Sequence, residues 1–599
     1  MGMSSSQARL LNLTARMHQI EYKASKLEAM KLQMANESSR VYETYLEAID
    51  KSKIQIKRLS TDGTIDYVDA TYNTLLNDGY RLSSSGAIAV TQADIDFFNA
   101  DADKNAVEFA CLKSGFAVKN GNFLTLANDS TQYLAFDANG LKDLVAIGKN
   151  IVLMDDIQVS SSLGTLKGSL NGNGHTIKAT GSSGIFSTIN GGSVKNLNID
   201  ANIKGLGTVG ALANTTTGNV KLENISVSGK IESTSNTGGL IGQNNSGTIT
   251  INNIYTGVNI KSSGGAGGVV GVNNNGKLDV DNITGNVTIN SKDPSGGILG
   301  NTWGPEINNI SNCNIGADIT VTNGVAGGIV GMAWDSIYAD NCYVTGNISS
   351  NSNNSYASAG GIYGGWGANT SKGNGQAGIS NCYTDVTLTA TASKPSYEST
   401  GDIGGLIWST NGTHYIKNCA SSNGTTFADL ESTNHNMTFS EAANINSVKQ
   451  NVQNVGNTQN PTTEYNPETA PNYTNYLEIG QAIASGNYFL VDGKEDNNEW
   501  LTNMVNNGSI ILEKPDNDGN YYDTSVATDT NLQEVSDESV IRKAEAKYEA
   551  DMKKIDNKDR KYDTDLAALD TERNALNEEM ETLKTVAKEN VERTFKLFG

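Results

Sequence analysis

The sequence predicts a mixed fold, in which long α-helical coiled-coil termini flank a central parallel β-solenoid, with small α/β junction segments between them. Two observations predict the helices: neither Gly nor Pro occurs between residues 3 and 62, or between residues 520 and 598. A third predicts the solenoid, because the middle repeats a double-Gly unit. The 63 Gly and 7 Pro lack the three-residue period of collagen, and regular aliphatic pairs argue against a disordered linker.

The N-terminal segment, residues 1–58, is expected to form one coiled-coil helix. Its apolar residues alternate spacings of three and four, which is the seam of a coiled coil. The seam residues, which we take as candidate assembly residues, are Leu10, Leu13, Met17, Ile20 and Leu27.

The C-terminal segment, residues 536–599, repeats this pattern over a greater length. Its candidate assembly residues are Leu566, Leu569, Leu576, Met580 and Leu583. About 60 helical residues give a rod of roughly 90 Å, which a small domain cannot cover. We therefore expect the helix to pair with the N-terminal helix of the same chain, while neighbouring copies cover the apolar stripe that remains.

Residues 151–422 form the repeat region. The double-Gly unit begins at Gly238, Gly267, Gly296, Gly327, Gly360 and Gly404. A near-constant period followed by growing insertions is typical of a solenoid with loops on one side. Glycine permits the sharp corners and close backbone approach that such coils need.

Each repeat also carries an Asn in register, and four of these are followed directly by Cys. The Asn residues are Asn224, Asn253, Asn282, Asn312, Asn341, Asn381 and Asn418. Stacked at one corner, they predict a ladder of amide hydrogen bonds. The Cys column, Cys313, Cys342, Cys382 and Cys419, is interpreted as small buried side chains, because metal clusters usually pair cysteines closely in sequence. Its redox or metal state stays open.

Two segments of mixed pattern, residues 59–150 and 476–535, lie between the helices and the repeats, with a polar linker at 423–475. They predict a compact α/β junction formed by both chain ends of the insert. This junction would cap the solenoid, whose ends otherwise expose strand edges.

Two stretches carry resemblances to known families. Gly168 to Ile177, GSLNGNGHTI, resembles the first coils of pectin-lyase-like β-helices, and the GGLIG, GGVVG, GGILG and GGIVG units resemble GLUG-type repeats of bacterial surface adhesins. This resemblance implies a right-handed coil. The paired terminal helices around a variable centre are similar in organisation to flagellin and hook-associated proteins. That similarity implies an extracellular or cell-surface protein, exported by a type III-like route without a cleaved signal peptide.

A polysaccharide lyase is the enzymatic alternative, because pectin-lyase-like folds often host such activity. Elimination needs a base, usually with a cation. Asp279 and Asp281 share a strand face but do not recur on a column, and His175 is expected to fill its own turn. We predict no catalytic residue, cofactor or metal. The stretch from Asp516 to Asp523 has oxygen ligands for Ca²⁺, yet it lacks the closing Glu of an EF-hand, and a turn is favoured.

Four tryptophans recur within or just after the double-Gly strands: Trp303, Trp334, Trp366 and Trp408. Facing outward, they would suit glycan or protein contact. Facing inward, together with Tyr363, they would fill a widening core, which is the favoured interpretation.

The net charge of the chain limits the kinds of partner that it is expected to bind. With 44 Lys and Arg against 65 Asp and Glu, the formal charge is −21, which disfavours nucleic acid. No window predicts a membrane span. We therefore expect a structural subunit of an extracellular bacterial filament or appendage, with the helices building the shaft and the solenoid displayed outward, open to glycan or host-surface contact. The alternatives are a surface adhesin or phage-like fibre, and the lyase.

Overall fold

The computed structural model describes residues 2–59, 63–334, 336–352, 356–366, 376–393, 398–407, 413–423, 429–430, 437–456, 460–516 and 519–596. It divides into two compact units, one of residues 1–91 and 488–599, the other of residues 92–487. The predicted fold class is confirmed: long terminal helices in contact flank a large central region of parallel strands, with small α/β segments.

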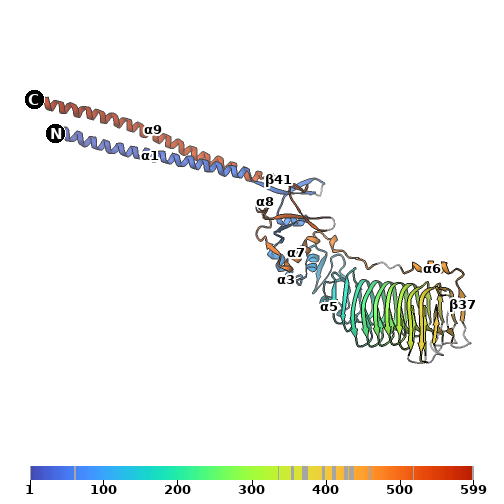
Figure 1. The fold of residues 1–599 in the computed structure, drawn as a ribbon. Coiled ribbons are helices and arrows are strands. Elements are labelled where there is room, and N and C mark those ends of the chain that lie inside the picture. Colours follow the sequence, from blue (N-terminus) through green and yellow to red (C-terminus); the bar gives the residue numbers. More distant parts are fainter. Residues whose placement is uncertain are drawn as a thin grey trace. The chain divides into compact units, whose positions relative to one another are not determined.

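The first unit contains an antiparallel helical hairpin of α1 (Gly2–Ile49) and α9 (Glu538–Lys596). The two helices run side by side, with both chain ends at the same end of the pair (Figure 1). The N-terminal helix ends at Ile49, so the prediction of a helix to residue 58 is wrong over its last turns.

Strand β1 (Ser52–Leu59) replaces the expected helix end. Its Ile54 and Ile56 alternate with polar residues and are buried, and this period of two favours a strand. β1 pairs antiparallel with β2 (Ile65–Asp69) and with β41 (Leu532–Ser536). The absence of Gly and Pro was therefore a poor guide to where the helix ends.

A second small sheet completes this unit, with strand order β38-β4-β3-β39-β40. Its elements and the two helices of this part are α2 (Tyr72–Asn77), β3 (Arg81–Ser84), β4 (Ala87–Val90), β38 (Tyr488–Leu490), α8 (Asn498–Asn506), β39 (Ile511–Pro515) and β40 (Tyr521–Thr524). Tyr80 is buried within the unit and donates a 2.6 Å hydrogen bond to Asp529.

The second unit begins with a small α/β segment. Its elements are α3 (Gln92–Ala100), α4 (Ala106–Lys113), β5 (Ala117–Asn120), β6 (Phe123–Leu126), β7 (Gln132–Ala135), α5 (Ala138–Ala146) and, from the C-terminal side, α7 (Tyr473–Ser485). Leu141, Leu144 and Val145 of α5 join the apolar core of the first coil. This helix therefore caps the N-terminal end of the solenoid. The two junction segments do not form one body, because each is divided between the two units.

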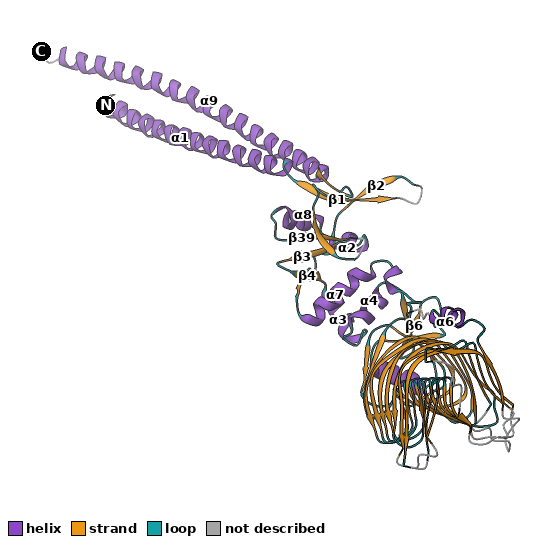
Figure 2. Ribbon diagram, turned by 45° about the vertical axis from the view of Figure 1, so that its right-hand side comes forward, coloured by secondary structure: helices purple, strands orange, loops and turns teal. Residues whose placement is uncertain are grey.

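The solenoid is a stack of parallel coils that share one continuous sheet (Figures 1 and 2). Its main strands are β8 (Asn150–Leu153), β9 (Ile157–Val159), β10 (Thr165–Leu166), β11 (Ser169–Asn171), β12 (Thr176–Gly181), β13 (Phe186–Gly205), β15 (Ala213–Ser233), β17 (Ile241–Asn244), β18 (Gly247–Ser262), β20 (Val270–Asn274), β21 (Gly276–Ser291), β23 (Leu299–Trp303), β24 (Asn308–Val321), β26 (Val330–Ala333), β27 (Ile337–Asp340), β28 (Tyr343–Ser352), β30 (Tyr363–Trp366), β31 (Gln376–Ser380), β32 (Tyr383–Ala392), β34 (Gly404–Ile407), β35 (Thr413–Ser421), β36 (Asp429–Leu430) and β37 (Met437–Glu441).

A second column of short strands runs beside them, in the order β14 (Val209–Gly210), β16 (Thr237–Gly238), β19 (Ala266–Gly267), β22 (Ser295–Gly296), β25 (Val325–Gly327), β29 (Ala357–Gly360) and β33 (Glu398–Gly401). Each carries the first Gly of its repeat. A Cβ added at Gly238 would overlap the carbonyl oxygen of Ile241, so this corner requires Gly. In the last repeat, Gly360 pairs with Gly401. The repeat therefore starts at Gly401, and the sequence alignment on Gly404 is wrong by three residues.

The segment expected to be a polar linker, 423–475, is largely structured. Strand β37 adds to β35 beyond residue 422. Helix α6 (Ile445–Gln453) then packs Val448 and Val452 against Tyr383 and Ala420 of the coils. From there the chain returns along the solenoid to a short 3₁₀ turn at Pro467–Thr469. We call the described residues of this stretch, 442–456 and 460–466, the return segment.

Candidate functional site

The helical hairpin contains the predicted assembly residues. Leu13, Met17 and Ile20 of α1 are buried with Leu576 of α9, and Leu569, Met580 and Leu583 pack against this cluster. Leu10, Leu27 and Leu566 are half-buried. One face of each helix is thus covered by the other.

Ion pairs join the two helices along the hairpin. Arg9 pairs with Glu579 at 2.6 Å, and Arg16 pairs with Glu572 at 2.5 Å. Lys31 contacts Asp563 and Asp559, and its hydrogen bond to Asp563 raises the pKa of the Lys31 ammonium. All these groups are substantially exposed, so each pair contributes little to stability.

The hairpin leaves apolar surface uncovered on both of its sides. A groove of about 470 Å³ lies beside Leu27, Met30 and Leu569, and one of about 310 Å³ lies beside Leu10, Leu583 and Val591. In an isolated hairpin such grooves are filled only by water.

Helix α1 also exposes large apolar side chains on the face turned away from α9. Leu11, Leu32 and Leu46 are 73%, 68% and 42% exposed. They are separated by 21 and 14 residues, so they share one heptad position, and with Leu10 and Leu13 at seam positions a and d this is position b. Position b is turned away from the seam, as is the f position of Tyr22, which is 73% exposed. The other b positions of this stretch, His18, Ser25 and Ser39, are polar. This face of α1 therefore carries separate exposed apolar residues, whereas α9 covers the seam face.

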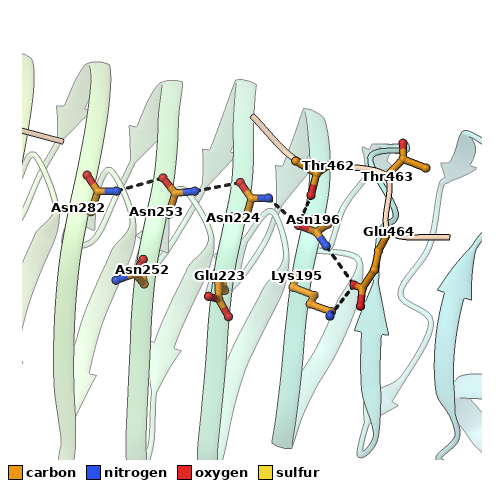
Figure 3. A pocket seen from close by; sticks show the side chains of 10 residues that line it. All are labelled: Lys195, Asn196, Glu223, Asn224, Asn252, Asn253, Asn282, Thr462, Thr463 and Glu464. Atoms are coloured by element: carbon orange, nitrogen blue, oxygen red, sulfur yellow. Dashed lines mark hydrogen bonds and ion pairs between the residues drawn. The ribbon is translucent and has the colours of Figure 1, made fainter. Parts of the chain in front are cut away.

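The second candidate site is the corner of the solenoid that carries the Asn ladder. All seven predicted residues have positive φ, between 51° and 59°, and Asn196 in the preceding coil shares this conformation. Asn tolerates this left-handed conformation better than other residues with a side chain. Figure 3 shows the side chains of Asn196, Asn224, Asn253 and Asn282 following one another along the coils.

Amide-to-amide hydrogen bonds join part of the ladder. Nδ2 of Asn253 donates to Oδ1 of Asn224 at 2.9 Å, and Nδ2 of Asn282 donates to Oδ1 of Asn253 at 3.1 Å. Asn224 donates in the same way to Asn196, Asn341 to Asn312, and Asn418 to Asn381.

At two positions of the ladder, a carboxylate accepts the hydrogen bond in place of an amide. Nδ2 of Asn312 donates to Asp281 at 2.6 Å, and Nδ2 of Asn381 donates to Asp340 at 2.7 Å. Asp281 and Asp340 directly precede Asn282 and Asn341, the ladder residues of the preceding coils. Each carboxylate therefore accepts the hydrogen bond that the adjacent ladder Asn was expected to accept. The continuous ladder is thus broken into three segments.

A polar groove of about 650 Å³ lies beside the first segment of the ladder (Figure 3). Its wall is Asn196, Asn224, Asn253 and Asn282, and the return segment crosses its end. Glu464 accepts from Lys195 at 2.6 Å, and Thr462 donates to Oδ1 of Asn196 at 3.3 Å. The groove is therefore partly occupied by the chain's own hydrogen-bonding groups.

The four cysteines after the ladder residues form a buried column, and all are free thiols. Each sulfur donates to the carbonyl two residues before it, for example Cys313 to Ser311 at 3.0 Å and Cys382 to Ser380 at 3.0 Å. Burial raises the pKa of Cys313 and of Cys382, so neither is a reactive thiolate. Among the residues that the structure describes, no group of three or more His, Cys, Asp or Glu side chains is arranged to hold a metal.

A second amide column, which was not predicted from the sequence, lies inside the coils. Nδ2 of Asn244 donates to Oδ1 of Asn273 at 2.8 Å, and Nδ2 of Asn273 donates to Oδ1 of Asn308 at 2.9 Å. All three side chains are fully buried. A signal was present, because Asn244 and Asn273 each lie six residues after the first Gly of their repeats.

The carboxylates considered for a lyase are engaged in structural contacts. Asp279 pairs with Lys277 at 2.6 Å and accepts from Asn309 at 2.8 Å. Asp281 accepts from Ser311 and Asn312, at 2.8 and 2.6 Å. His175 lies 3.5 Å from Asp156. The Asp516–Asp523 stretch includes residues 517 and 518, which lie outside the described part of the chain.

The expected inward orientation of the tryptophans is wrong for Trp303, which is 44% exposed and stacks on half-buried Trp334. Tyr363 is buried in the core, and its hydroxyl donates to the carbonyl of Gly378 at 3.1 Å. The side chain of Trp366 and all of Trp408 lie outside the described residues. Trp303 faces outward because it ends β23 at the turn before β24.

Comparison with known proteins adds little. No protein family matches the chain, and no curated protein matches it. A solved structure described as a putative immunoglobulin A1 protease from Bacteroides ovatus aligns with 36% of this chain and 76% of its own, at 19% identity and a TM-score of 0.29. A likeness at this score supports no conclusion about activity. Within the described helices, none is both long and apolar enough to cross a membrane.

Proposed function

We propose that the chain is a self-assembling structural subunit of an extracellular bacterial filament or appendage. The helices of many copies would build the shaft, and the solenoid would be displayed outward. The observation that carries this proposal is the apolar surface of α1 that α9 leaves uncovered, which includes the exposed side chains of Leu11, Tyr22, Leu32 and Leu46. Exposed apolar residues on one side of a helix can pack against another helix, and a second copy of this chain supplies one.

The organisation of the chain supports the same role. Both long helices stand at the chain ends, as in flagellin and hook-associated proteins, and the repeats between them resemble pectin-lyase-like coils and GLUG-type adhesin repeats. The proposal therefore includes a right-handed coil, a location outside the cell or at its surface, and a type III-like export route. It includes no enzymatic step, since Asp279 and Asp281 are already bonded to neighbouring coils and side chains.

Sedimentation velocity of the full chain tests this proposal. We expect the wild type to form large assemblies and the variant Leu11→Lys/Leu32→Lys/Leu46→Lys to sediment as a monomer with unchanged circular dichroism, because outward-facing surface changes cost the monomer little. The control is Leu206→Lys, which changes an 87% exposed solenoid residue and should assemble as the wild type does. A wild-type chain that stays monomeric at every concentration, or a triple variant that still assembles, contradicts the proposal.

A further inference from the structure

Two stacked aromatic pairs lie on the outer surface of the later coils. Trp303 and Trp334 have ring centroids 5.3 Å apart at an interplanar angle of 25°, and Tyr338 and Tyr415 are 6.1 Å apart at 27°. Trp303 is 44% exposed, and the other three rings are half-buried. The pairs lie on either side of the turn that joins β26 to β27. We call these four residues the aromatic strip.

The contact between Tyr338 and Tyr415 requires a glycine at the position between them. Tyr338, Gly378 and Tyr415 occupy one column of three successive coils. A Cβ added at Gly378 would overlap the ring of Tyr415. Because position 378 is Gly, the ring of Tyr415 lies across that coil and reaches Tyr338.

The strip is long enough to follow a chain-like ligand. Trp334 and Tyr338 are four residues apart, so their Cα atoms are separated by at most about 14 Å. Successive coils add about 4.8 Å each, and the strip spans the four coils from Trp303 to Tyr415. Trp303 and Trp334 stack on each other, as do Tyr338 and Tyr415, so the strip presents to a ligand with apolar faces those parts of the rings that their neighbours leave exposed.

Polar groups alternate with these rings on the same outer strands. Asn309, Asp340 and Ser380 lie on β24, β27 and β31, one or three residues before a ladder Asn, and all are half-buried. Lys417 places its Nζ 4.6 Å from the ring centroid of Tyr415. Asn309 donates to Asp279, and Ser380 donates to Asp340. The further lone pairs of these oxygens, together with the rings, suit a hydroxyl-rich ligand with apolar ring faces, which is the chemistry of a sugar chain.

The charges beside the strip decide which sugar chains fit. Asp279, Asp281 and Asp340 lie on the adjoining strand face, and Glu306 is exposed between Trp303 and the next strand. Lys277 is already paired with Asp279, and these four carboxylates outnumber the exposed Lys417 beside Tyr415. Uronate polymers would bring further carboxylates to this surface, and like charges repel.

We propose that the aromatic strip binds an uncharged glycan chain and disfavours anionic ones. This inference rests on the proposed function, which displays the solenoid outward, and it names what the displayed region binds. It also places recognition away from the groove of the Asn ladder, which the return segment crosses.

Titration of the full-length protein with hexasaccharides tests the inference, using tryptophan fluorescence and calorimetry. The probes are neutral hexaoses built from glucose, xylose, mannose and N-acetylglucosamine, with hexagalacturonate as the anionic probe. We expect at least one neutral hexaose to bind and to change the fluorescence, with hexagalacturonate at least tenfold weaker. If no neutral hexaose binds, or if hexagalacturonate binds as tightly, the inference is wrong.

Matched variants assign the binding to the strip. Trp303→Ala should weaken the neutral hexaose about two- to tenfold, the range expected for one stacking ring. Tyr522→Ala, which removes a 50% exposed ring of the other unit, should leave binding unchanged. Equal effects of the two variants overturn the inference. Trp303→Ala should assemble as the wild type does, and the triple Leu→Lys variant should still bind the hexaose, so failure of this site and failure of the proposed assembly are distinguishable.

Discussion

Along the solenoid, each coil buries its aliphatic side chains against the coils before and after it, whereas along the hairpin each helix buries only one stripe against the other. Ile225, Ile254 and Ile283 occupy one column and are buried almost completely. In the hairpin, Leu11 and Leu32 are more than two-thirds exposed. The apolar side chains of the solenoid are buried within a single chain, whereas the hairpin of a single chain leaves large apolar side chains exposed.

This difference indicates where each region obtains its stability. Stacked repeats interact mainly with their nearest neighbours, so damage in one coil stays local. A long two-helix pair has no such internal support and gains stability from any further helix that covers it. We expect substitutions in the two regions to have separable effects, and the following predictions test that separation.

The largest loss of stability should come from the solenoid core. Ile254→Ala removes fully buried methyl groups between two neighbouring coils, which should lower the free energy of unfolding by about 2–5 kcal/mol. Urea unfolding followed by hydrogen exchange measures this loss. Protection should fall around β18 and remain in α1 and α9; a loss of protection in the helices would contradict the separation.

A smaller effect should come from the ladder. Asn253→Ala removes an amide that both donates and accepts and places Ala at φ 57°. We expect a loss of about 1–3 kcal/mol. Asn253→Gly relieves the backbone cost and should lose less. The urea midpoints of the two variants separate the loss of the hydrogen bonds from the backbone cost of Ala. An equal loss of stability in both variants would mean that the positive φ at this corner costs Ala nothing.

Glu108 of α4 should make the second unit sensitive to pH. Burial, with Asp103 and Asp137 nearby, raises the pKa of Glu108 to about 7. A raised folded pKa contributes stability that is fully present below the unfolded pKa, near 4.3, and is lost as pH rises through about 7. Glu108→Gln should therefore stabilise the protein at pH 8 by about 1–2 kcal/mol, after allowance for partial exposure.

The control for this pH effect is the same pair of proteins at pH 4. There the wild type and Glu108→Gln should have nearly equal urea midpoints. A stabilisation of the variant that is the same at both pH values would show that the carboxyl group is not its source.

The smallest effect should come from the surface of the hairpin. Arg16→Ala removes an exposed pair with Glu572 and should cost about 0.2–1 kcal/mol, less at high salt. Thermal unfolding at about 20 mM and about 500 mM salt measures this loss of stability. Arg593→Ala, near the end of α9, serves as the matched surface control. A larger cost at high salt would contradict a screened ion pair.

The sequence was informative where periodicity is strong. Seam residues such as Met17 and Leu576 recur at heptad spacing, and the double-Gly units recur at a near-constant period, so the fold class could be predicted. The end of α1 could not, because Ile54 and Ile56 form a period-two pattern too short to outweigh the absence of Gly and Pro. The last repeat was misplaced because Gly401-Asp402 lacks the second Gly of its unit.

Features that depend on contacts between distant residues were also not predictable. The return segment packs Val448 and Val452 on the coils, but a short amphipathic stretch in a polar region does not show which surface covers it. The replacement of ladder amides by Asp281 and Asp340 depends on which rotamer reaches the next coil. The outward orientation of Trp303 depends on where β23 ends, and repeat spacing alone does not fix that position.

Electron microscopy of the purified full-length protein tests the central claim most directly. The account predicts helical filaments with a helix-built shaft and projecting solenoids, lost when residues 588–599 are removed or when Leu566, Leu569 and Leu576 are replaced by Ser, while the solenoid keeps its strand signal in circular dichroism. Discrete monomers or trimers under all conditions, or filaments that survive these changes, would contradict it.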